Sequence, residues 1–153
     1  MTSQLSRLEN SWLKILIVFY NKYLNVEILL AEGKVDSAIA AGKLLSPTNK
    51  WWATFFEPKP YRKDVLARAY IKKGEMDKAV KEYEWLTTPY PENNYKGLRH
   101  PTYHYRLAKL YEQTNQNEKA VERYERFLAL WKNADKDLPE MIDANKRLAL
   151  LKK

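Results

Sequence analysis

The stretch LARAYIKKGEMDKAVKEYEWL (66–86) decides the fold of this chain, together with LAKLYEQTNQNEKAVERYERF (107–127), which follows it 41 positions later. In each stretch, apolar residues first recur at helical spacing, and a Gly or Asn comes next. These two residue types tolerate the left-handed conformation that ends a helix. An acidic residue then complements the positive start of a second helix, which carries its own apolar stripe. The two stretches therefore predict a repeated pair of antiparallel helices joined by a tight turn.

The same period reaches the N-terminal part of the chain. The first copy is degenerate, because Gly42 stands where the later copies have Tyr83 and Tyr124. Three copies in register indicate a repeat architecture rather than a chance match. The positions that recur in all three are Gly33, Gly74 and Asn115, then Ala38, Ala79 and Ala120, then Leu45, Leu86 and Phe127.

This pattern resembles the tetratricopeptide repeat, in which a small residue, an aromatic, a Gly, an Ala, a second aromatic and a late Pro recur at fixed offsets. The resemblance covers roughly residues 19–134. The family period is about 34 residues, and this unit is about seven longer. The extra length falls in two Pro- and aromatic-rich connectors, 46–60 and 87–101. In the middle copy the family offsets are occupied by Ala67, Tyr70, Gly74, Ala79, Tyr83 and Pro91.

The resemblance implies an all-α fold, a right-handed α-α superhelix (a TPR-like solenoid) of about three helix pairs with N-terminal and C-terminal capping helices. A chain of 153 residues fits one domain, so we expect a single domain over 1–153. Asp137 and Glu140 have capping-box spacing and predict the start of the last helix. The expected parts are a helix over 4–18, a degenerate repeat over 19–59, repeats over 60–100 and 101–136, and a capping helix over 138–152.

A second resemblance concerns the C-terminal part of the chain. The stretches HPTYHYRLAKLYE (100–112) and FLALWKNADKDLPE (127–140) look like the end of repeat regions in prokaryotic multidomain signalling and regulatory proteins. Several of those proteins carry a kinase, cyclase or transcription-factor part upstream. The resemblance implies that this chain is a piece of a longer protein.

The sequence offers nothing that predicts catalysis. It has no Gly-rich phosphate loop, no nucleophile elbow and no zinc-binding spacing. Its two histidines, His100 and His104, do not make a metal site, because His100 precedes Pro101 and is expected outside the helix. We therefore expect no enzymatic activity, no metal and no cofactor.

The charge of the chain is basic but dispersed. The formal net charge is +8, and Lys and Arg exceed Asp and Glu by similar amounts in each third of the chain. A nucleic-acid site should instead gather its bases on one stripe. Single-stranded nucleic-acid binding through dispersed basic and aromatic residues stays open as the alternative, but a protein or peptide partner, with acidic groups as its expected feature, is favoured.

In the tetratricopeptide family, peptides lie in a concave groove lined by the first helix of each unit. The resemblance implies a basic, Tyr-lined groove here. Arg68 and Lys109 hold equivalent positions along one wall, which suits an acidic group or a C-terminal carboxylate. The paired Asn of the family's carboxylate clamp are missing, which argues against that particular ligand. The groove candidates are Tyr20, Tyr23, Tyr61, Arg68, Lys72, Tyr105, Arg106 and Lys109.

Four aromatic residues in the first connector form a possible contact loop: Trp51, Trp52, Phe55 and Phe56. Adjacent aromatic pairs cannot all face one core, so some of them are expected at a partner or dimer contact. The alternative is that the loop folds back over neighbouring helix ends. We expect a monomer or a weak homodimer. The absence of Cys fits a reducing compartment, so the expected location is cytoplasmic. The apolar run 13–19 is far shorter than the ~20 residues of a membrane span.

Overall fold

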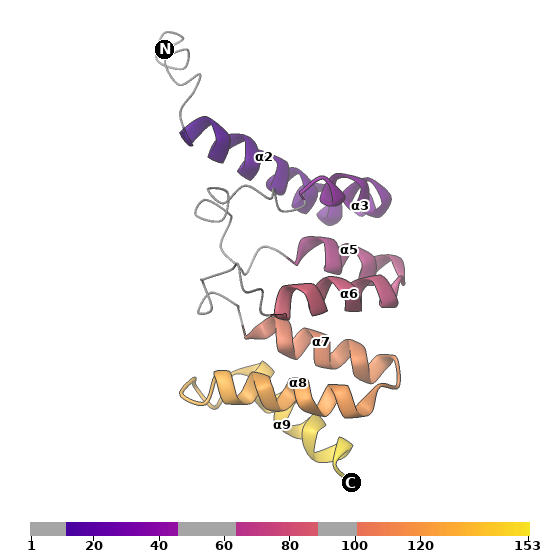
Figure 1. The fold of residues 1–153 in the computed structure, drawn as a ribbon, viewed down its shortest axis with the longest axis vertical. Coiled ribbons are helices and arrows are strands. Elements are labelled where there is room, and N and C mark those ends of the chain that lie inside the picture. The colour runs from indigo at the N-terminus through magenta and orange to yellow at the C-terminus, as the bar shows by residue number, and fades with distance from the viewer. Residues whose placement is uncertain (1–11, 46–63, 89–100) are drawn as a thin grey trace. The chain divides into compact units, whose positions relative to one another are not determined.

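The computed structural model describes residues 12–45, 64–88 and 101–153, and all structural statements concern these residues. They contain helices and no strand (Figure 1). This agrees with the predicted all-α class. The helices are α2 (Trp12–Ala31), α3 (Val35–Lys43), α5 (Val65–Lys73), α6 (Met76–Thr87), α7 (Thr102–Gln113), α8 (Asn117–Leu130) and α9 (Pro139–Leu151).

The predicted turns end their helices in the left-handed conformation. Gly33 has a φ of 78°, Gly74 a φ of 83° and Asn115 a φ of 58°. In the first copy the Lys34 N–H donates to the Leu29 carbonyl oxygen at 2.9 Å. The third copy repeats this bond between the Gln116 N–H and the Tyr111 carbonyl oxygen at 2.8 Å. The degenerate copy therefore closes its turn as the clear copy does.

The chain divides into two compact units, Met1–Lys73 and Gly74–Lys153, and each is described by itself. In the first unit, α2 packs against α3, and α3 packs against α5. Gly42 explains why this copy departs from the repeat pattern. A Cβ atom added there would lie 3.1 Å from Leu66 Cδ1 and 3.7 Å from Val26 Cγ1. The missing side chain therefore allows α3 to approach α5, where the later copies have a tyrosine.

The second unit contains α6, α7, α8 and α9. Here α7 packs against α6 and α8, and α9 packs mainly on α8 (Figure 1). Tyrosines fill the space between the helices: Tyr83 and Tyr103 lie 6.1 Å apart between ring centroids, and Tyr124 is fully buried. The last helix begins with Pro139 in its first turn, where a missing N–H costs nothing, and buries Met141 and Ala144.

One expected boundary differs from the structure. The border predicted at residue 18 falls inside α2, which runs from Trp12 to Ala31 without a break. No Gly or Pro interrupts this segment, and its apolar residues continue on both sides of the border. None of the described helices is both long enough and apolar enough to span a membrane. The contact loop Trp51, Trp52, Phe55 and Phe56, the groove candidate Tyr61 and His100 lie outside the described residues.

Candidate functional site

The described groove candidates lie on the first helix of each predicted pair. Tyr20 and Tyr23 are on α2, Arg68 and Lys72 on α5, and Tyr105, Arg106 and Lys109 on α7. Tyr20 is 40% exposed, whereas Tyr23 is only 5% exposed. The spacing of Tyr23 from Val26 and Leu30 explains this, because all three face the core of the first unit.

Arg68 is held by two carboxylates in the first unit. Its Nη2 donates to Oε1 of Glu27 on α2, and its Nε donates to Oδ1 of Asp64 at 3.1 Å. The Asp64 side chain is only 1% exposed. Burial opposes the charge of Arg68, but the hydrogen bond to Glu27 and the charge of Asp64 outweigh it and raise the arginine pKa further. Arg68 therefore connects α2 to the start of α5.

Lys72 lies one turn further along α5 and also reaches α2. Its Nζ donates to the Leu30 carbonyl oxygen at 2.9 Å. That carbonyl belongs to the last turn of α2, where backbone acceptors lack partners inside the helix. A cation is also favoured at a helix C-terminus. Only one of the three ammonium hydrogens is needed for this bond, so Lys72 keeps donors for another group.

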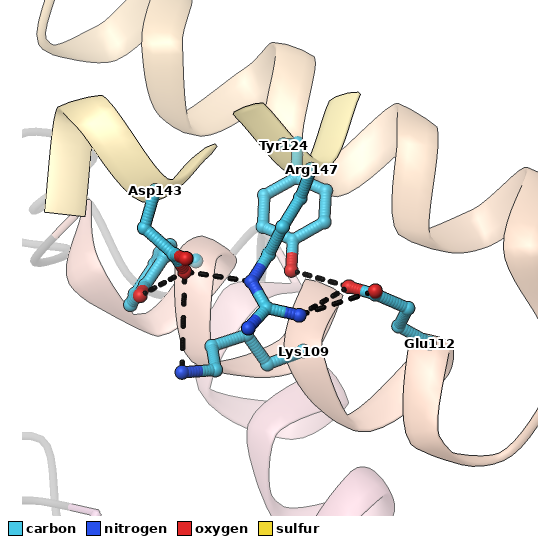
Figure 2. A network of polar contacts seen from close by, with 6 residues as sticks. Lys109, Glu112, Tyr124, Asp143 and Arg147 are labelled. Carbon is cyan, nitrogen blue, oxygen red and sulfur yellow. Dashed lines mark hydrogen bonds and ion pairs between the residues drawn. The ribbon is translucent and has the colours of Figure 1, made fainter. Parts of the chain in front are cut away.

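A larger polar network joins α7, α8 and α9 in the second unit. Arg147 lies at its centre, between Asp143 on one side and Glu112 on the other (Figure 2). Its Nε donates to Asp143 Oδ2 at 2.7 Å, and its Nη1 donates to both carboxylate oxygens of Glu112 at 3.1 Å. Two tyrosine hydroxyls complete it: Tyr105 donates to Asp143 Oδ2 at 2.6 Å and Tyr124 to Glu112 Oε2 at 2.9 Å.

Lys109 is the loosest member of this polar network. Its Nζ lies 4.0 Å from Asp143 Oδ2, beyond hydrogen-bond distance, and 5.4 Å from the centre of the Tyr105 ring. Its side chain remains 37% exposed. Burial works against the ionisation of Asp143, but hydrogen bonds from Tyr105 and Arg147 outweigh it and lower the pKa of the carboxyl. Asp143 is thus satisfied without Lys109.

Arg68 in the first unit and Lys109 in the second unit have similar surroundings. Arg68 and Lys109 stand one repeat apart, and each faces a carboxylate from a neighbouring helix, Glu27 on α2 or Asp143 on α9. In each unit the candidate surface therefore carries both signs of charge. Sequence reasoning missed Asp143 because the last step of the repeat shortens: Asp143 follows Lys109 by 34 positions instead of 41. Looking for the family's own 34-residue period after residue 109 would have found it.

The described residues contain no group of three or more His, Cys, Asp or Glu side chains placed to hold a metal ion. His104 is 5% exposed and lies in the first turn of α7. Glu112 and Asp143 serve as acceptors for Arg147 and the two tyrosines instead.

Two segments of the chain match models of one repeat family. Residues 64–85 and residues 104–137 each match a model described as a tetratricopeptide repeat. The first segment covers α5 and most of α6, and the second covers most of α7 and all of α8. No curated protein matches the chain in sequence.

Solved structures of similar fold include proteins of two bacteria. One is the type III secretion chaperone SycD of Yersinia enterocolitica, in complex with a peptide of the translocator YopD. It matches at 13% identity with a TM-score of 0.67, over 88% of this chain and 92% of that chain. PcrH of Pseudomonas aeruginosa matches at 13% identity with a TM-score of 0.66, over 89% and 92%. PcrH in complex with the chaperone-binding region of PopD matches at 14% with a TM-score of 0.61, over 95% and 96%. These likenesses concern the fold, and they confirm the predicted all-α, repeat-built class.

Proposed function

This chain is a tetratricopeptide repeat protein, and on that basis we propose that it is a non-catalytic module that binds a peptide or a partner protein. Two structures of similar fold were solved with bound segments, SycD with a peptide of the translocator YopD and PcrH with the chaperone-binding region of PopD. Helix-pair repeats present extended surfaces for such contacts. This supports a binding role for the present chain without naming its partner.

Each unit has its own proposed binding surface, which consists of side chains on the first helices of the helix pairs. In the first unit these are Tyr20 and Lys72, and in the second Tyr105, Arg106 and Lys109. Tyr61 remains a candidate from the sequence. Arg68 is assigned a structural role and not a ligand contact, because its guanidinium already contacts Glu27 and the buried Asp64.

Lys109 carries the proposal. Its ammonium group lies 4.0 Å from Asp143, which is already bonded to Tyr105 and Arg147. Lys109 can therefore turn toward a carboxylate of a ligand without leaving Asp143 unpaired. Lys72 has the same capacity, since one bond to a carbonyl oxygen leaves two donors. An acidic peptide is the ligand that both groups favour.

The ion pairs weigh against the nucleic-acid alternative. A base that already contacts a carboxylate releases few counterions when it meets a phosphate, so it adds little to nucleic-acid affinity. Many of the described bases are in this position: Lys34, Arg68, Lys73, Lys78, Arg147 and Lys152.

Fluorescence polarisation tests the proposal with a short labelled peptide that is rich in Asp and Glu and ends in a free carboxylate. The double variant Lys72→Gln with Lys109→Gln should weaken binding about 10-fold, because each unit loses a charge-assisted contact. The matched control, Lys34→Gln with Lys78→Gln, removes the same charge from two exposed lysines and should bind as the parent does. Equal losses in both variants would mean non-specific attraction to the basic chain. If Lys72→Gln with Lys109→Gln binds the peptide as tightly as the parent does, the two lysines do not form the binding surface.

A further inference from the structure

Tyr105 contacts both members of the loose pair formed by Lys109 and Asp143. Its hydroxyl donates to Asp143 Oδ2 at 2.6 Å. The centre of its ring lies 5.4 Å from Lys109 Nζ, within the range of a cation–π contact. All three residues belong to the second unit, on α7 and α9. Tyr105 is therefore placed to influence how closely Lys109 and Asp143 interact.

The packing of the Tyr105 ring fixes the direction of its hydroxyl. The ring centroid lies 5.4 Å from that of Phe127 and 6.2 Å from that of Tyr124. Both of these residues lie on α8 and are fully buried. Aromatic pairs at such separations pack favourably, so these contacts hold the ring in place. The hydroxyl is thus directed at Asp143 before any ligand arrives.

Two donors already occupy the Asp143 oxygen that Lys109 approaches. Besides the Tyr105 hydroxyl, Oδ2 accepts a hydrogen bond from Arg147 Nε at 2.7 Å. A carboxylate oxygen has two lone pairs, so these two bonds use the acceptor capacity of Oδ2. Both distances are those of charge-assisted bonds, which are stronger than neutral ones. This explains why Lys109 Nζ remains 4.0 Å from the same oxygen (Figure 2).

We propose that Tyr105 is a positioning residue of the peptide site, whose hydroxyl holds Asp143 and thereby keeps Lys109 available for a ligand carboxylate. The inference rests on the proposed function, which assigns that contact to Lys109. Without the hydroxyl, Oδ2 regains a lone pair, and the Lys109 ammonium group moves from 4.0 Å to a hydrogen-bond distance of about 2.8 Å. A ligand carboxylate then has to displace Asp143, so the affinity for the ligand falls.

Tyr105→Phe tests this role, because it removes the hydroxyl and keeps the ring. The acidic peptide should bind about threefold more weakly in fluorescence polarisation, as for competition from one exposed ion pair. Tyr124→Phe is the matched control, since it removes a hydroxyl of the same polar network that donates to Glu112 instead. This control should leave the affinity unchanged. An equal loss in both variants would mean a general loosening of the network and would overturn the proposal.

A double variant separates positioning from direct contact with the ligand. In Asp143→Asn the charge that attracts Lys109 is absent, so adding Tyr105→Phe should cause no further loss of affinity. Such non-additivity is expected of two residues that act through one interaction. If Tyr105→Phe weakens peptide binding threefold in both backgrounds, its hydroxyl contacts the ligand itself and the positioning role is wrong.

NMR relaxation of the lysine ammonium groups checks the inference without any ligand. Lys109 should be mobile in the parent protein and restricted in Tyr105→Phe, because it gains a bond to Asp143. Lys78, which pairs with Glu75 at the start of α6, should be unchanged. Unchanged mobility of Lys109 would overturn the positioning role. Restriction of Lys109 together with no peptide binding by the parent would establish the positioning of Lys109 and refute the acidic ligand.

Discussion

Arg68 donates a hydrogen bond to Glu27, the residue that stands 41 positions, one full repeat, before it in the chain. The same guanidinium contacts Asp64, which is almost fully buried. The arginine therefore links the first helices of two successive repeats inside one unit. In the second unit Arg147 does the same for α7 and α9 through Glu112 and Asp143 (Figure 2).

Replacing Arg68 should destabilise the first unit. Arg68→Gln removes the cation from beside Glu27 and the buried Asp64. We expect a loss of about 2 kcal/mol in the free energy of unfolding, between the cost of an exposed pair and that of a buried one. Urea denaturation followed by circular dichroism measures this. Lys78→Gln, which breaks an exposed pair with Glu75, should cost less than about 0.5 kcal/mol. If Arg68→Gln lowers the free energy of unfolding by no more than Lys78→Gln does, the contacts of Arg68 do not stabilise the fold.

Restoring the repeat pattern at Gly42 should also harm the first unit. Tyr stands at the equivalent position in the later copies, but Leu66 and Val26 occupy the space at Gly42. Gly42→Tyr should therefore lower the free energy of unfolding by about 3 kcal/mol through overpacking. Lys43→Tyr, at the exposed neighbouring position, should change it little. A Gly42→Tyr variant as stable as the parent would show that α3 does not need its close approach to α5.

These two residues show how far sequence reasoning reaches. The helix pairs and their left-handed turns at Gly33, Gly74 and Asn115 can be predicted from the local sequence. Each turn position requires a positive φ, which Gly and Asn adopt more readily than other residues. The departure from the repeat pattern at Gly42 cannot be predicted in this way. It arises because Leu66, on α5, occupies the space that a side chain at position 42 would need. A repeat period aligns equivalent residues, but it does not report which neighbour fills the space.

The candidate site was harder to predict for a related reason. The spacing of the tetratricopeptide repeat located Arg68 and Lys109 in the sequence. The charge of the surface around each of them also depends on carboxylates from other helices, which this spacing does not identify. Asp143 lies on a helix that breaks the 41-residue period, so no alignment within the chain pointed to it. Exposed apolar residues on α2, such as Leu24 and Ile28, could not be predicted for another reason. Apolar residues surround this helix, and only the packing of α3 and α5 against it shows which of them remain exposed.

The three tyrosines that donate to carboxylates should make the second unit sensitive to alkali. Burial and the bonds to Asp143, Glu84 and Glu112 raise the pKa of Tyr105, Tyr111 and Tyr124 above the usual value of about 10. A tyrosine pKa raised by folding contributes stability that is complete below the unfolded-state pKa of about 10. This stability is lost as the pH rises from there through the folded-state pKa. Phenolate absorbance should therefore rise later in the native protein than in urea.

A variant assigns this delay to a named bond. Tyr124→Phe removes the hydroxyl that donates to Glu112, so one tyrosine fewer should titrate late. Its free energy of unfolding at neutral pH should fall by about 1.5 kcal/mol, as for a hydrogen bond to a charged group. A titration curve identical in native and unfolded protein would show that the three hydroxyls are not held by their carboxylates.

The balance of charge around Lys109 predicts an unusual gain of binding. Asp143→Asn removes the negative charge that attracts Lys109, while Arg147 keeps its two bonds to Glu112. A ligand carboxylate then no longer competes with Asp143, so the acidic peptide should bind about threefold more tightly. Glu75→Gln removes an equal charge next to Lys78 and should leave the affinity unchanged. Polarisation titrations at matched ionic strength separate the two variants, because a general charge effect would raise both alike. If Asp143→Asn weakens the peptide instead, Asp143 itself orients the ligand, and Lys109 is not the group that receives it.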